Sequence, residues 1–455
     1  MIPLLDAAAM RAADATAAAR VGEATLITRA GFAVGLTAAD MLGSLYGRRV
    51  AVVAGTGHNG DDGRVAARWL RDRGAKVDVF DATDAPRQLR GYNLVIDAAY
   101  GLGCSRPYFS PDVDDHTLVL AVDLPSGVNA DTGEVLGRPM VADVTLALGA
   151  LKPSHLIGPA TEFVGEVRFA GLDIVDSAPS GIVESSDLAH FVRQHRDDHK
   201  WRHAVLLIAG SPTMPGAAVL AAHGALATGA SMMRVCVPEV KTSRREGFPA
   251  EVVHLEAAVS ELSDITVSVA TRLHAVVIGP GLGRDPAMRR EVRSLIDRAR
   301  MPVVLDADGL HAVDVPWLAQ RQHTDAPVVL TPHDGEYTAL YGRVPGEDRL
   351  EAARSLARDT HCIVLLKGPT TIVASPTGDV RVVTAGTPAL ATAGTGDVLA
   401  GMIAGAIARG HAPLTAAALA AHLHGLAGAR VSVYGTAHEL VGGVAEILGE
   451  LTRAS

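Results

Sequence analysis

The sequence predicts an α/β protein of two domains, each built around a mostly parallel β-sheet. Short apolar strands alternate with helical stretches, the alternation fades after "EVRFAGLDI", and it starts again near residue 203. Residues 176–203 are polar and carry turn-forming residues. A chain of 455 residues has room for two or three domains. We therefore expect domains at 1–184 and 185–455.

The first half is expected to begin its sheet with a strand at 48–57, followed by a helix that ends at Gly74. Further strands are expected at 76–81, 93–101, 117–127 and 141–150. Strands that are apolar along their whole length are typical of a parallel sheet covered on both faces.

The second half repeats this alternation over a longer stretch. A strand at 203–210 precedes a helix at 215–230 that Gly229 stops. Two Ala-rich helices close the chain, one at 398–407 and one at 414–431. Between them and the first helix, strands are expected at 231–237, 274–283, 301–310, 326–336 and 362–375.

Composition disfavours several classes of function. The net charge of −9 and the pI near 6.0 disagree with the basic surface of a nucleic-acid-binding protein. No apolar run is long enough to cross a bilayer, and the first residues lack the pattern of a signal peptide. The widely spaced Cys104, Cys236 and Cys362 suit a reduced compartment. We expect a cytoplasmic homo-oligomer without nucleic-acid or membrane partners.

A glycine-rich turn lies between the first strand and the first helix of the sheet. Gly55, Gly57 and Gly60 match G-x-G-x-x-G, and Asp78 and Asp81 follow about 20 residues on, as in a dinucleotide fingerprint. That pattern alone would favour a dehydrogenase. The same turn reads "GHNGDDG", however, and its acids would repel a pyrophosphate.

Oxygen-bearing side chains gather at the predicted carboxyl ends of strands in the first half. Asp97 and Asp123 end two strands, and Asn59 and Ser126 lie in turns that follow strands. Ligands of open α/β sheets bind at these ends, and hard oxygen ligands suit a cation. These residues therefore predict one crevice that holds a cation. The alternative, that each acid only caps a turn, stays open from this pattern alone.

The first half resembles the NAD(P)H-hydrate epimerases in "GTGHNGDDGRVAAR", "DAAYGLGCSRP" and "VDLPSGVNADTG", across most of residues 1–175. The resemblance implies a Rossmann-like domain that interconverts the R and S epimers of NADHX and NADPHX, the hydrated nicotinamide cofactors, beside a potassium ion. It implies Asn59, Asp97 and Ser126 as potassium ligands and Asp123 as the acid–base residue. It also implies a substrate site lined by Asp123 and two segments: His58, Asn59, Gly60, Asp61 and Asp62, and Gly101, Leu102, Gly103, Cys104, Ser105, Arg106 and Pro107.

One of these segments departs from the family pattern. The usual Asn-Asn-Gly-Gly-Asp has a histidine at its first position, His58, and an aspartate at its fourth, Asp61. Asn59 and Asp62 keep the cation-ligand and final positions. The added charge leaves open an alternative in which the first domain is a non-catalytic binding module.

The stretch "AGTGDVLAG" places Asp397 at the start of a predicted buried helix. The first turn of a helix offers unpaired N–H groups and a positive dipole end, and glycines let an anion approach them. Gly394 and Gly396 therefore predict a phosphate site. Asp397 either caps the helix or faces a hydroxyl that must lose its proton.

Other polar and glycine residues follow strands of the same predicted sheet. The segment "VLLKGPTTIV" brings Lys367, Gly368, Thr370 and Thr371, which suit a nucleotide's phosphate or ribose. Three further turns hold a glycine series, a histidine and a pair of acids: Gly279, Gly281 and Gly283, then His333, then Asp306 and Asp308.

The second half resembles the ADP- or ATP-dependent NAD(P)H-hydrate dehydratases, which have a ribokinase-like fold. "AGSPTMPGAAVLAA", "IGPGLG", "DADGL", "TPHDGE", "LLKGPTTI" and "AGTGD" occur in the family's order from about residue 200 to the end. The family's DADALN reads DADGLH here, so we assign Asp306 and Asp308 a supporting role. The resemblance implies hydrate contacts from Ala217, Gly281, His333 and Asp397, and contacts to a Mg²⁺-bound nucleotide from Lys367, Gly368, Pro369, Thr370, Thr371 and Gly396.

Together the two halves are similar to the bifunctional NAD(P)H-hydrate repair enzymes of bacteria. The expected function is epimerisation of R- and S-NAD(P)HX and dehydration of the S form to NAD(P)H at the expense of ADP or ATP. Asp397 is the expected base of the second reaction. The competing hypothesis is a ribokinase-like small-molecule kinase with a non-catalytic N-terminal module.

Overall fold

The computed structural model describes residues 1–192, 199–240, 247–321 and 326–454. The chain separates into two compact units, one of residues 2–181 and one of residue 1 with 182–455. The division lies close to the boundary expected after residue 184. None of the helices in the described ranges combines the length and the apolar character that a membrane span needs.

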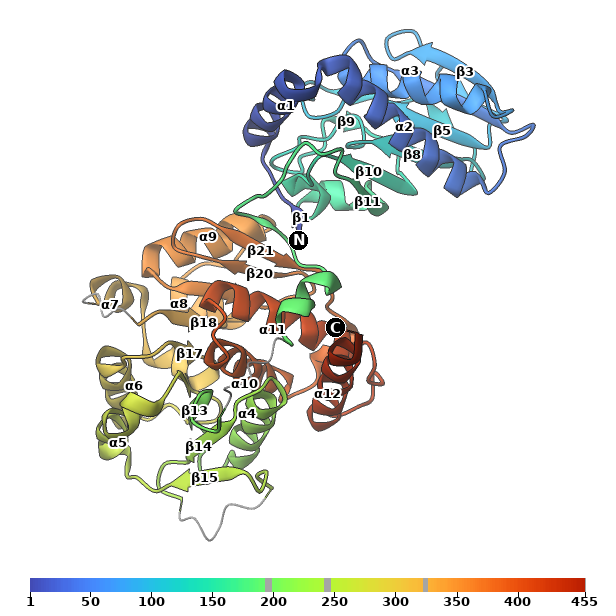
Figure 1. Ribbon diagram of the computed structural model, residues 1–455. Coiled ribbons are helices and arrows are strands. Elements are labelled where there is room, and N and C mark those ends of the chain that lie inside the picture. The colour runs from blue at the N-terminus through green and yellow to red at the C-terminus, as the bar shows by residue number, and fades with distance from the viewer. Residues whose placement is uncertain (193–198, 241–246, 322–325, 455) are drawn as a thin grey trace. The chain divides into compact units, whose positions relative to one another are not determined.

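The unit of residues 2–181 is built on a parallel sheet with the strand order β11-β10-β8-β5-β2-β3 (Figure 1). The chain leaves β2 first to one side, to β3, and later to the other side, to β5, so the order reverses between β2 and β5. Ligands of such sheets bind at this reversal. The strands are β2 (Arg49–Ala54), β3 (Lys76–Asp81), β5 (Leu94–Ala98), β8 (Leu118–Val122), β10 (Val144–Leu148) and β11 (Glu166–Ala170).

The two faces of this sheet are covered differently. Helices α2 (Glu23–Leu42) and α3 (His58–Arg71) pack on the face that presents Val50 and Val52, with α1 (Ala7–Val21) beside α2. On the other face, Val53, Val95 and Ala121 pack against Leu89, Tyr108 and Met140 from irregular segments and short strands. The sequence predicted cover on both faces, but one cover consists of β4 (Gln88–Leu89), β6 (Tyr108–Phe109), β7 (Asp112–Val113), β9 (Gly137–Arg138) and the loops between them.

The segment His58–Asp62, which the sequence analysis treated as a loop, forms the first turn of α3. Gly57 precedes it in an extended conformation. Gly60 is part of this turn, and a Cβ atom there would lie 2.0 Å from the carbonyl oxygen of Gly55. The glycine therefore lets the helix begin directly against the end of β2.

The unit that contains residues 182–455 is built on a larger sheet. Its strands follow the order β12-β21-β20-β19-β18-β17-β16-β13-β14-β15. The strands from β15 to β19 are parallel. They are β12 (Gly181–Ile182), β13 (Ala204–Ile208), β14 (Met232–Cys236), β15 (Val252–Leu255), β16 (Ala275–Ile278), β17 (Val303–Leu305), β18 (Val328–Leu330), β19 (Ile363–Leu366), β20 (Thr371–Ala374) and β21 (Val380–Val383).

The stretch 362–375 was expected as a single strand, and that prediction was wrong. It forms β19 and β20, which pair in antiparallel fashion. The turn between them contains Gly368 and Pro369, which interrupt the strand because proline has no N–H to donate. The turn at Lys367–Thr370 is the segment that the sequence analysis assigned to the nucleotide.

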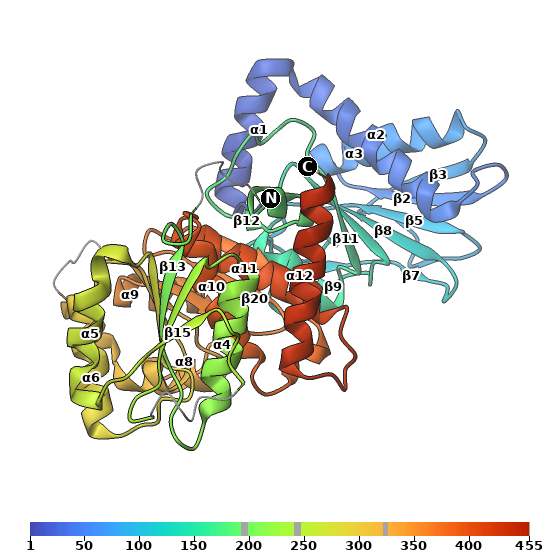
Figure 2. The same cartoon turned by 60° about the horizontal axis from the view of Figure 1, so that its bottom comes forward.

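Helices lie on both sides of this sheet (Figure 2). On one side α4 (Pro215–Ala227), α10 (Thr395–Ala408), α11 (Pro413–Gly428) and α12 (Ala437–Ala454) pack together. Helices α5 (Leu262–Val269), α6 (Pro286–Arg298), α7 (Val315–Gln320), α8 (Asp334–Tyr341) and α9 (Arg349–Thr360) complete the set. The sequence analysis expected two closing helices; α12 is a third.

Helices α4 and α10 approach closely because glycines face backbone across their contact. A Cβ atom at Gly401 would lie 1.9 Å from the carbonyl oxygen of Ala221, and one at Gly224 would lie 2.2 Å from that of Val398. The buried small side chains of α10 form a continuous core with α4 and the strands. This packing holds the start of α10, and with it Asp397, in a fixed place.

Candidate active sites

The first candidate site lies where the strand order reverses and is centred on Asp97 at the end of β5. The Asp97 carboxylate is fully buried and accepts hydrogen bonds from the Ser126 hydroxyl at 2.6 Å, the Ser126 N–H at 2.8 Å and the Ala99 N–H at 3.3 Å. Burial raises the pKa of Asp97, and the Ser126 hydrogen bonds oppose that rise. Within the described residues Asp97 has no cationic partner.

Two buried polar groups of this unit lack hydrogen-bond partners in the described residues. The amide nitrogen of Asn59 and the hydroxyl of Tyr108 are both buried and unpartnered within the described part of the chain. Asn59 lies beside Gly101, where an added Cβ atom would be 3.3 Å from the Asn59 side chain. Burial, followed by the charge of Asp97, raises the pKa of Tyr108. The structure thus joins Asp97 directly to Ser126 by hydrogen bonds and places the Asn59 side chain beside Gly101.

Asp123, at the end of β8, is held by a lysine and a histidine that the sequence analysis did not identify. The Lys152 ammonium, 1% exposed, donates to the Asp123 carboxylate and to the carbonyl oxygens of Leu148 and Ala150, each at 2.9 Å. His155 accepts from the Lys152 N–H at Nδ1, so its Nε2–H donates to the Asp123 carbonyl oxygen at 2.8 Å. Burial lowers the pKa of His155 to about 4, which keeps the ring neutral. The position of "LKPSH" directly after β10 could have indicated these residues.

Two more carboxylates interact electrostatically with Asp123. Burial, with the charges of Asp123, Asp61 and Asp14, raises the pKa of Asp62 to about 8. Burial also raises the pKa of Asp14, a residue of α1 that the sequence analysis missed. Asp62 therefore carries a proton at neutral pH beside an ion-paired Asp123.

Some residues that were predicted to line the substrate site of this unit interact with residues that were not predicted to belong to the site. His58 bonds Glu23 at 2.6 Å, and both side chains are mostly exposed. Asp61 is 3.7 Å from Arg64. The segment Gly101–Pro107 follows β5, and its Cys104 is buried.

Two glycines of the G-x-G-x-x-G match, Gly55 and Gly60, pack closely against backbone, whereas Gly57 has open space beside it. A Cβ atom at Gly55 would lie 1.9 Å from the carbonyl oxygen of Ala99. Arg64 donates to the Gly55 carbonyl at 2.7 Å and to Asp81 at 2.8 Å. Because Asp81 is paired with an arginine, it is not the free ribose acceptor that a dinucleotide fingerprint requires.

The second candidate site surrounds the start of α10. Gly394 adopts a left-handed conformation with φ of 93° and is the N-cap, and Asp397 follows in the first turn. Burial raises the pKa of Asp397 to about 7; the charges of Asp306, Asp308 and Glu336 add to this rise, and that of Lys367 opposes it. The carboxylate is poised between its two protonation states near neutral pH. Gly394 rather than Asp397 thus occupies the capping position.

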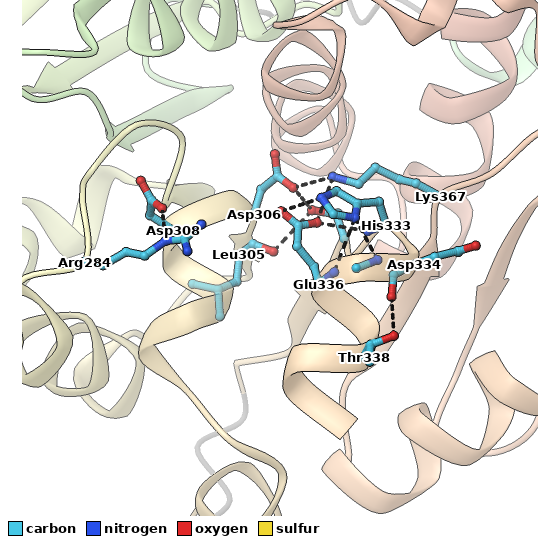
Figure 3. A network of polar contacts seen from close by, with 11 residues as sticks. Arg284, Leu305, Asp306, Asp308, His333, Asp334, Glu336, Thr338 and Lys367 are labelled. Carbon is cyan, nitrogen blue, oxygen red and sulfur yellow. Dashed lines mark hydrogen bonds and ion pairs between the residues drawn. The ribbon is translucent and has the colours of Figure 1, made fainter. Parts of the chain in front are cut away.

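Lys367, at the end of β19, joins acids from two other elements (Figure 3). Its ammonium donates to Asp306 at 2.9 Å and forms an ion pair with Glu336 at 3.5 Å. Thr331 donates to the same Asp306 oxygen at 2.7 Å. Burial alone would lower the pKa of Lys367, but the two carboxylates outweigh it and raise the pKa. The side chain that was predicted to contact the nucleotide is therefore a charged member of a carboxylate cluster.

His333 is the N-cap of α8. Its Nδ1 accepts from the N–H groups of Gly335 and Glu336 at 3.0 and 3.3 Å, and Glu336 accepts from the His333 N–H at 2.9 Å. This reciprocal capping box fixes the ring, which remains more than half exposed, beside Glu336. Sequence reasoning identified the histidine but not Glu336, although its spacing of three residues is the signature of a capping box.

Two of the predicted hydrate contacts lie side by side. A Cβ atom at Gly281 would be 2.9 Å from the Ala217 Cβ, and Gly281 has a positive φ of 64°. Asp308 accepts from the Gly283 N–H and from Arg284, each at 2.9 Å, so it braces the turn after β16 (Figure 3). The supporting role of Asp308 stays a prediction.

The predicted nucleotide turn is tied to its surroundings by Arg349. This residue binds both carboxylate oxygens of Asp334 at 2.8 and 3.0 Å and donates to the Lys367 carbonyl at 2.8 Å. Thr371 donates to the Gly368 carbonyl at 3.2 Å. A Cβ atom at Gly396 would lie 3.7 Å from the Lys367 ammonium, so the turn reaches the start of α10.

Comparison with known proteins assigns each half of the chain to a family model. Residues 205–441 match the NAD(P)H-hydrate dehydratase model, and residues 23–90 and 81–154 match the model of the YjeF-related protein N-terminus. Among solved structures, an ADP/ATP-dependent NAD(P)H-hydrate dehydratase from Bacillus subtilis, co-crystallised with ATP and Mg²⁺, is 29% identical. Its match covers 59% of this chain and 97% of that chain with a TM-score of 0.51.

Curated relatives span both halves. A bifunctional NAD(P)H-hydrate repair enzyme from Moorella thermoacetica is 32% identical over 85% of this chain and 84% of its own. The protein of the same name from Mycobacterium tuberculosis is 36% identical over 81% of this chain and 80% of its own. Identity of this level over both domains is more than a shared fold, so the chain belongs to the family of bifunctional NAD(P)H-hydrate repair enzymes.

Proposed function

We propose that the unit of residues 182–455 dehydrates S-NADHX and S-NADPHX with ADP or ATP, and that the unit of residues 2–181 interconverts the S and R epimers. The observation that carries the proposal is Asp397, a half-buried carboxylate in the first turn of α10 beside a lysine. A base and an anion site at one point suit a reaction that deprotonates a hydroxyl while it moves a phosphoryl group.

Hydroxide is a poor leaving group, so the ring hydroxyl is first phosphorylated. Its oxygen forms a bond to the terminal phosphorus of the nucleotide, the bridging P–O bond breaks, and the hydroxyl proton passes to Asp397. Phosphate then leaves with the electrons of the C–O bond, and the adjacent ring carbon loses a proton. The products are NAD(P)H, phosphate and, from ADP, AMP. A base with a pKa of about 7 is well matched to this proton transfer at neutral pH.

Magnesium would reach this centre with the nucleotide. In the described part of the chain, no three or more His, Cys, Asp or Glu side chains are arranged to hold a metal ion by themselves. The charges of Asp306, Asp308 and Glu336 act on Asp397, and these three acids are at ion-pair distance from Arg284, His333 or Lys367. The nucleotide's own oxygens would therefore supply most of the ligands of the ion, which leaves Asp397 available as the base. Magnesium neutralises phosphate charge, and Gly396 offers the open backbone for the nucleotide. Pro369, Thr370 and Thr371 lie in the adjoining turn.

Epimerisation inverts the ring carbon that bears the hydroxyl. In the proposed step an acid protonates the hydroxyl, which leaves as water with the electrons of the C–O bond, and the ring nitrogen's electron pair stabilises the cationic carbon. Water then adds to the opposite face and returns a proton to the base. Asp123 is the proposed acid–base residue, since Lys152 and His155 fix its position at a strand end. Potassium is proposed for Asp97, which is fully buried and has no cationic partner in the described residues, and for Asn59, whose amide nitrogen is buried and unpartnered there. The amide can turn its oxygen toward an ion, and Ser126 supplies a further oxygen.

The test is to incubate the protein with mixed R and S hydrates, magnesium and either ADP or ATP, and to follow the absorbance of the reduced nicotinamide. The proposal expects full recovery of the mixture with at least one nucleotide and none without. Absence of recovery with both nucleotides contradicts it. The competing small-molecule kinase is not favoured, because the relatives share both halves of the chain.

Three buried cysteines that lie far apart in the sequence, Cys104, Cys236 and Cys362, suit the reduced cytoplasm that we propose as the setting of this reaction. The homo-oligomer stays a prediction from the sequence.

A further inference from the structure

The main chain of Lys367 lies on the turn predicted to bind the nucleotide, but its ammonium lies beside Asp306, Glu336 and the start of α10. Its main chain belongs to the end of β19, but its side chain reaches Asp306 after β17 and Glu336 in α8. A Cβ atom at Gly396, one residue before Asp397, would be 3.7 Å from Nζ. The charge therefore stands beside the proposed base and the first turn of α10.

The contacts of Lys367 leave part of its hydrogen-bonding capacity available. A lysine ammonium has three donors. Within the described residues one is used by Asp306 at 2.9 Å, and Glu336 lies at ion-pair distance, 3.5 Å. Asp306 is 2% exposed and is itself held by Thr331, so the pair fixes Nζ in space. At least one donor remains for a ligand.

We propose that Lys367 is a catalytic residue that contacts the phosphoryl group in transit, and that Asp306 and Glu336 position its ammonium for this role. This inference rests on the proposed dehydration reaction. In that step the phosphoryl moves from nucleotide oxygen to ring oxygen and Asp397 takes the proton. Lys367 keeps all its protons and neutralises charge that grows on the phosphoryl oxygens, together with the N–H groups of α10.

The opposing view is that Lys367 anchors the nucleotide, as the sequence resemblance implies. The two views differ in kinetics. An anchor binds ground state and transition state equally, so its loss raises the KM or Kd for nucleotide and leaves kcat unchanged. A group that acts on the moving phosphoryl lowers kcat and has little effect on nucleotide affinity.

The experiment compares Lys367→Met with the wild-type full chain and with Lys200→Met, which removes an exposed lysine of the same unit. ADP binding is measured by calorimetry with Mg²⁺ and without hydrate, and kcat is measured with pure S-hydrate. We expect Lys367→Met to lower kcat by about 10²- to 10³-fold, as loss of an oxyanion donor does. The Kd for ADP should change by less than about threefold, and Lys200→Met should match the wild type.

Removal of Lys367 leaves Asp306 buried without a cation, which can impair folding. The double variant Lys367→Met with Asp306→Asn removes both charges and should fold while remaining slow. Glu336→Gln should lower kcat less than Lys367→Met, and Lys367→Arg, which keeps the charge, should recover part of kcat.

The inference is overturned if kcat is unchanged and a higher Kd for ADP accounts for the whole loss of kcat/KM. Lys367 would then only bind the nucleotide. Normal kcat in the folded double variant overturns it as well. If the proposed function itself is wrong, the wild type will not convert S-hydrate, so the two failures can be told apart.

Discussion

Each unit places a buried or half-buried lysine against an aspartate at the carboxyl end of its sheet, but the two lysines have different capacities. Lys152 is fully enclosed and donates to Asp123 and to two carbonyl oxygens, which uses its three donors. Lys367 bonds one aspartate, lies near one glutamate and is partly exposed. The first lysine therefore fixes a carboxylate, and the second retains a donor for a ligand.

Each unit also places a second carboxylate whose pKa is raised beside this pair. Burial is the main cause in both cases: the pKa of Asp62 rises to about 8, and the pKa of Asp397 rises to about 7. Paired carboxyl groups with different protonation are typical of acid–base sites. The two sites therefore differ more in the contacts of their lysines than in their acids, and on the proposed function this difference would separate epimerisation from phosphoryl transfer.

The largest expected effect is at Asp397. Asp397→Asn keeps the size of the side chain but cannot accept the proton, so dehydration of S-hydrate should fall by about 10²- to 10⁴-fold. ADP binding, measured by calorimetry, should persist. Near-normal turnover would remove Asp397 from the mechanism and leave the second unit without its base.

The enclosure of Lys152 predicts a stability effect. Lys152→Met leaves the Asp123 carboxylate buried without its cation, which should lower the free energy of unfolding by about 3–5 kcal/mol. Denaturant unfolding measures the change. Lys152→Met combined with Asp123→Asn should recover much of the loss, and Lys76→Met, at an exposed strand position, is the control. An unchanged unfolding midpoint in the single variant would mean that the ion pair is not formed.

The buried charge at Asp97 predicts a specific loss in the first unit. Asp97→Ala should weaken epimerisation by about 10-fold or more and raise the potassium concentration that it needs. Dehydration of pure S-hydrate should be unchanged because the second unit carries its own site. If both activities fell together, misfolding or a shared site would explain the result better.

The raised pKa of Asp397 predicts a pH dependence of dehydration. Asp397 must be ionised to accept a proton, and its pKa is raised to about 7. The kcat for dehydration should therefore rise about tenfold per pH unit below 7 and level off above it. A rate that stays flat from about pH 5.5 to about pH 7, the interval just below that pKa, would place the base elsewhere.

Much of the fold could be predicted because local patterns determine it. Apolar runs indicated the strands, and Gly394 followed by an apolar helix indicated α10. The start of α3 was missed because glycines and acids are poor helix formers, yet packing of Gly60 on Gly55 favours the turn. The antiparallel β20 depends on Gly368 and Pro369, which the apolar pattern on either side concealed.

Site residues that belong to a local sequence motif could be predicted. Site residues that reach the site only through a contact between distant parts of the chain were missed. Asp97, Asp123 and Asp397 each end a strand or begin a helix within a recognisable segment. Lys152 acts on Asp123 from 29 residues away, and Lys367 reaches Asp306 across 61. No local pattern specifies such pairs, since they depend on which strands become neighbours in the sheet.

The central claim is that two separate sites act on the two epimers, and its most direct test uses the full chain with Asp123→Asn. An equal mixture of R- and S-hydrate is incubated with Mg²⁺ and the active nucleotide, and the two epimers are separated by chromatography over time. The account predicts that the wild type consumes both, whereas the variant consumes S-hydrate at the wild-type rate and leaves about half of the mixture as R-hydrate. Consumption of both epimers at equal rates by the variant would contradict it.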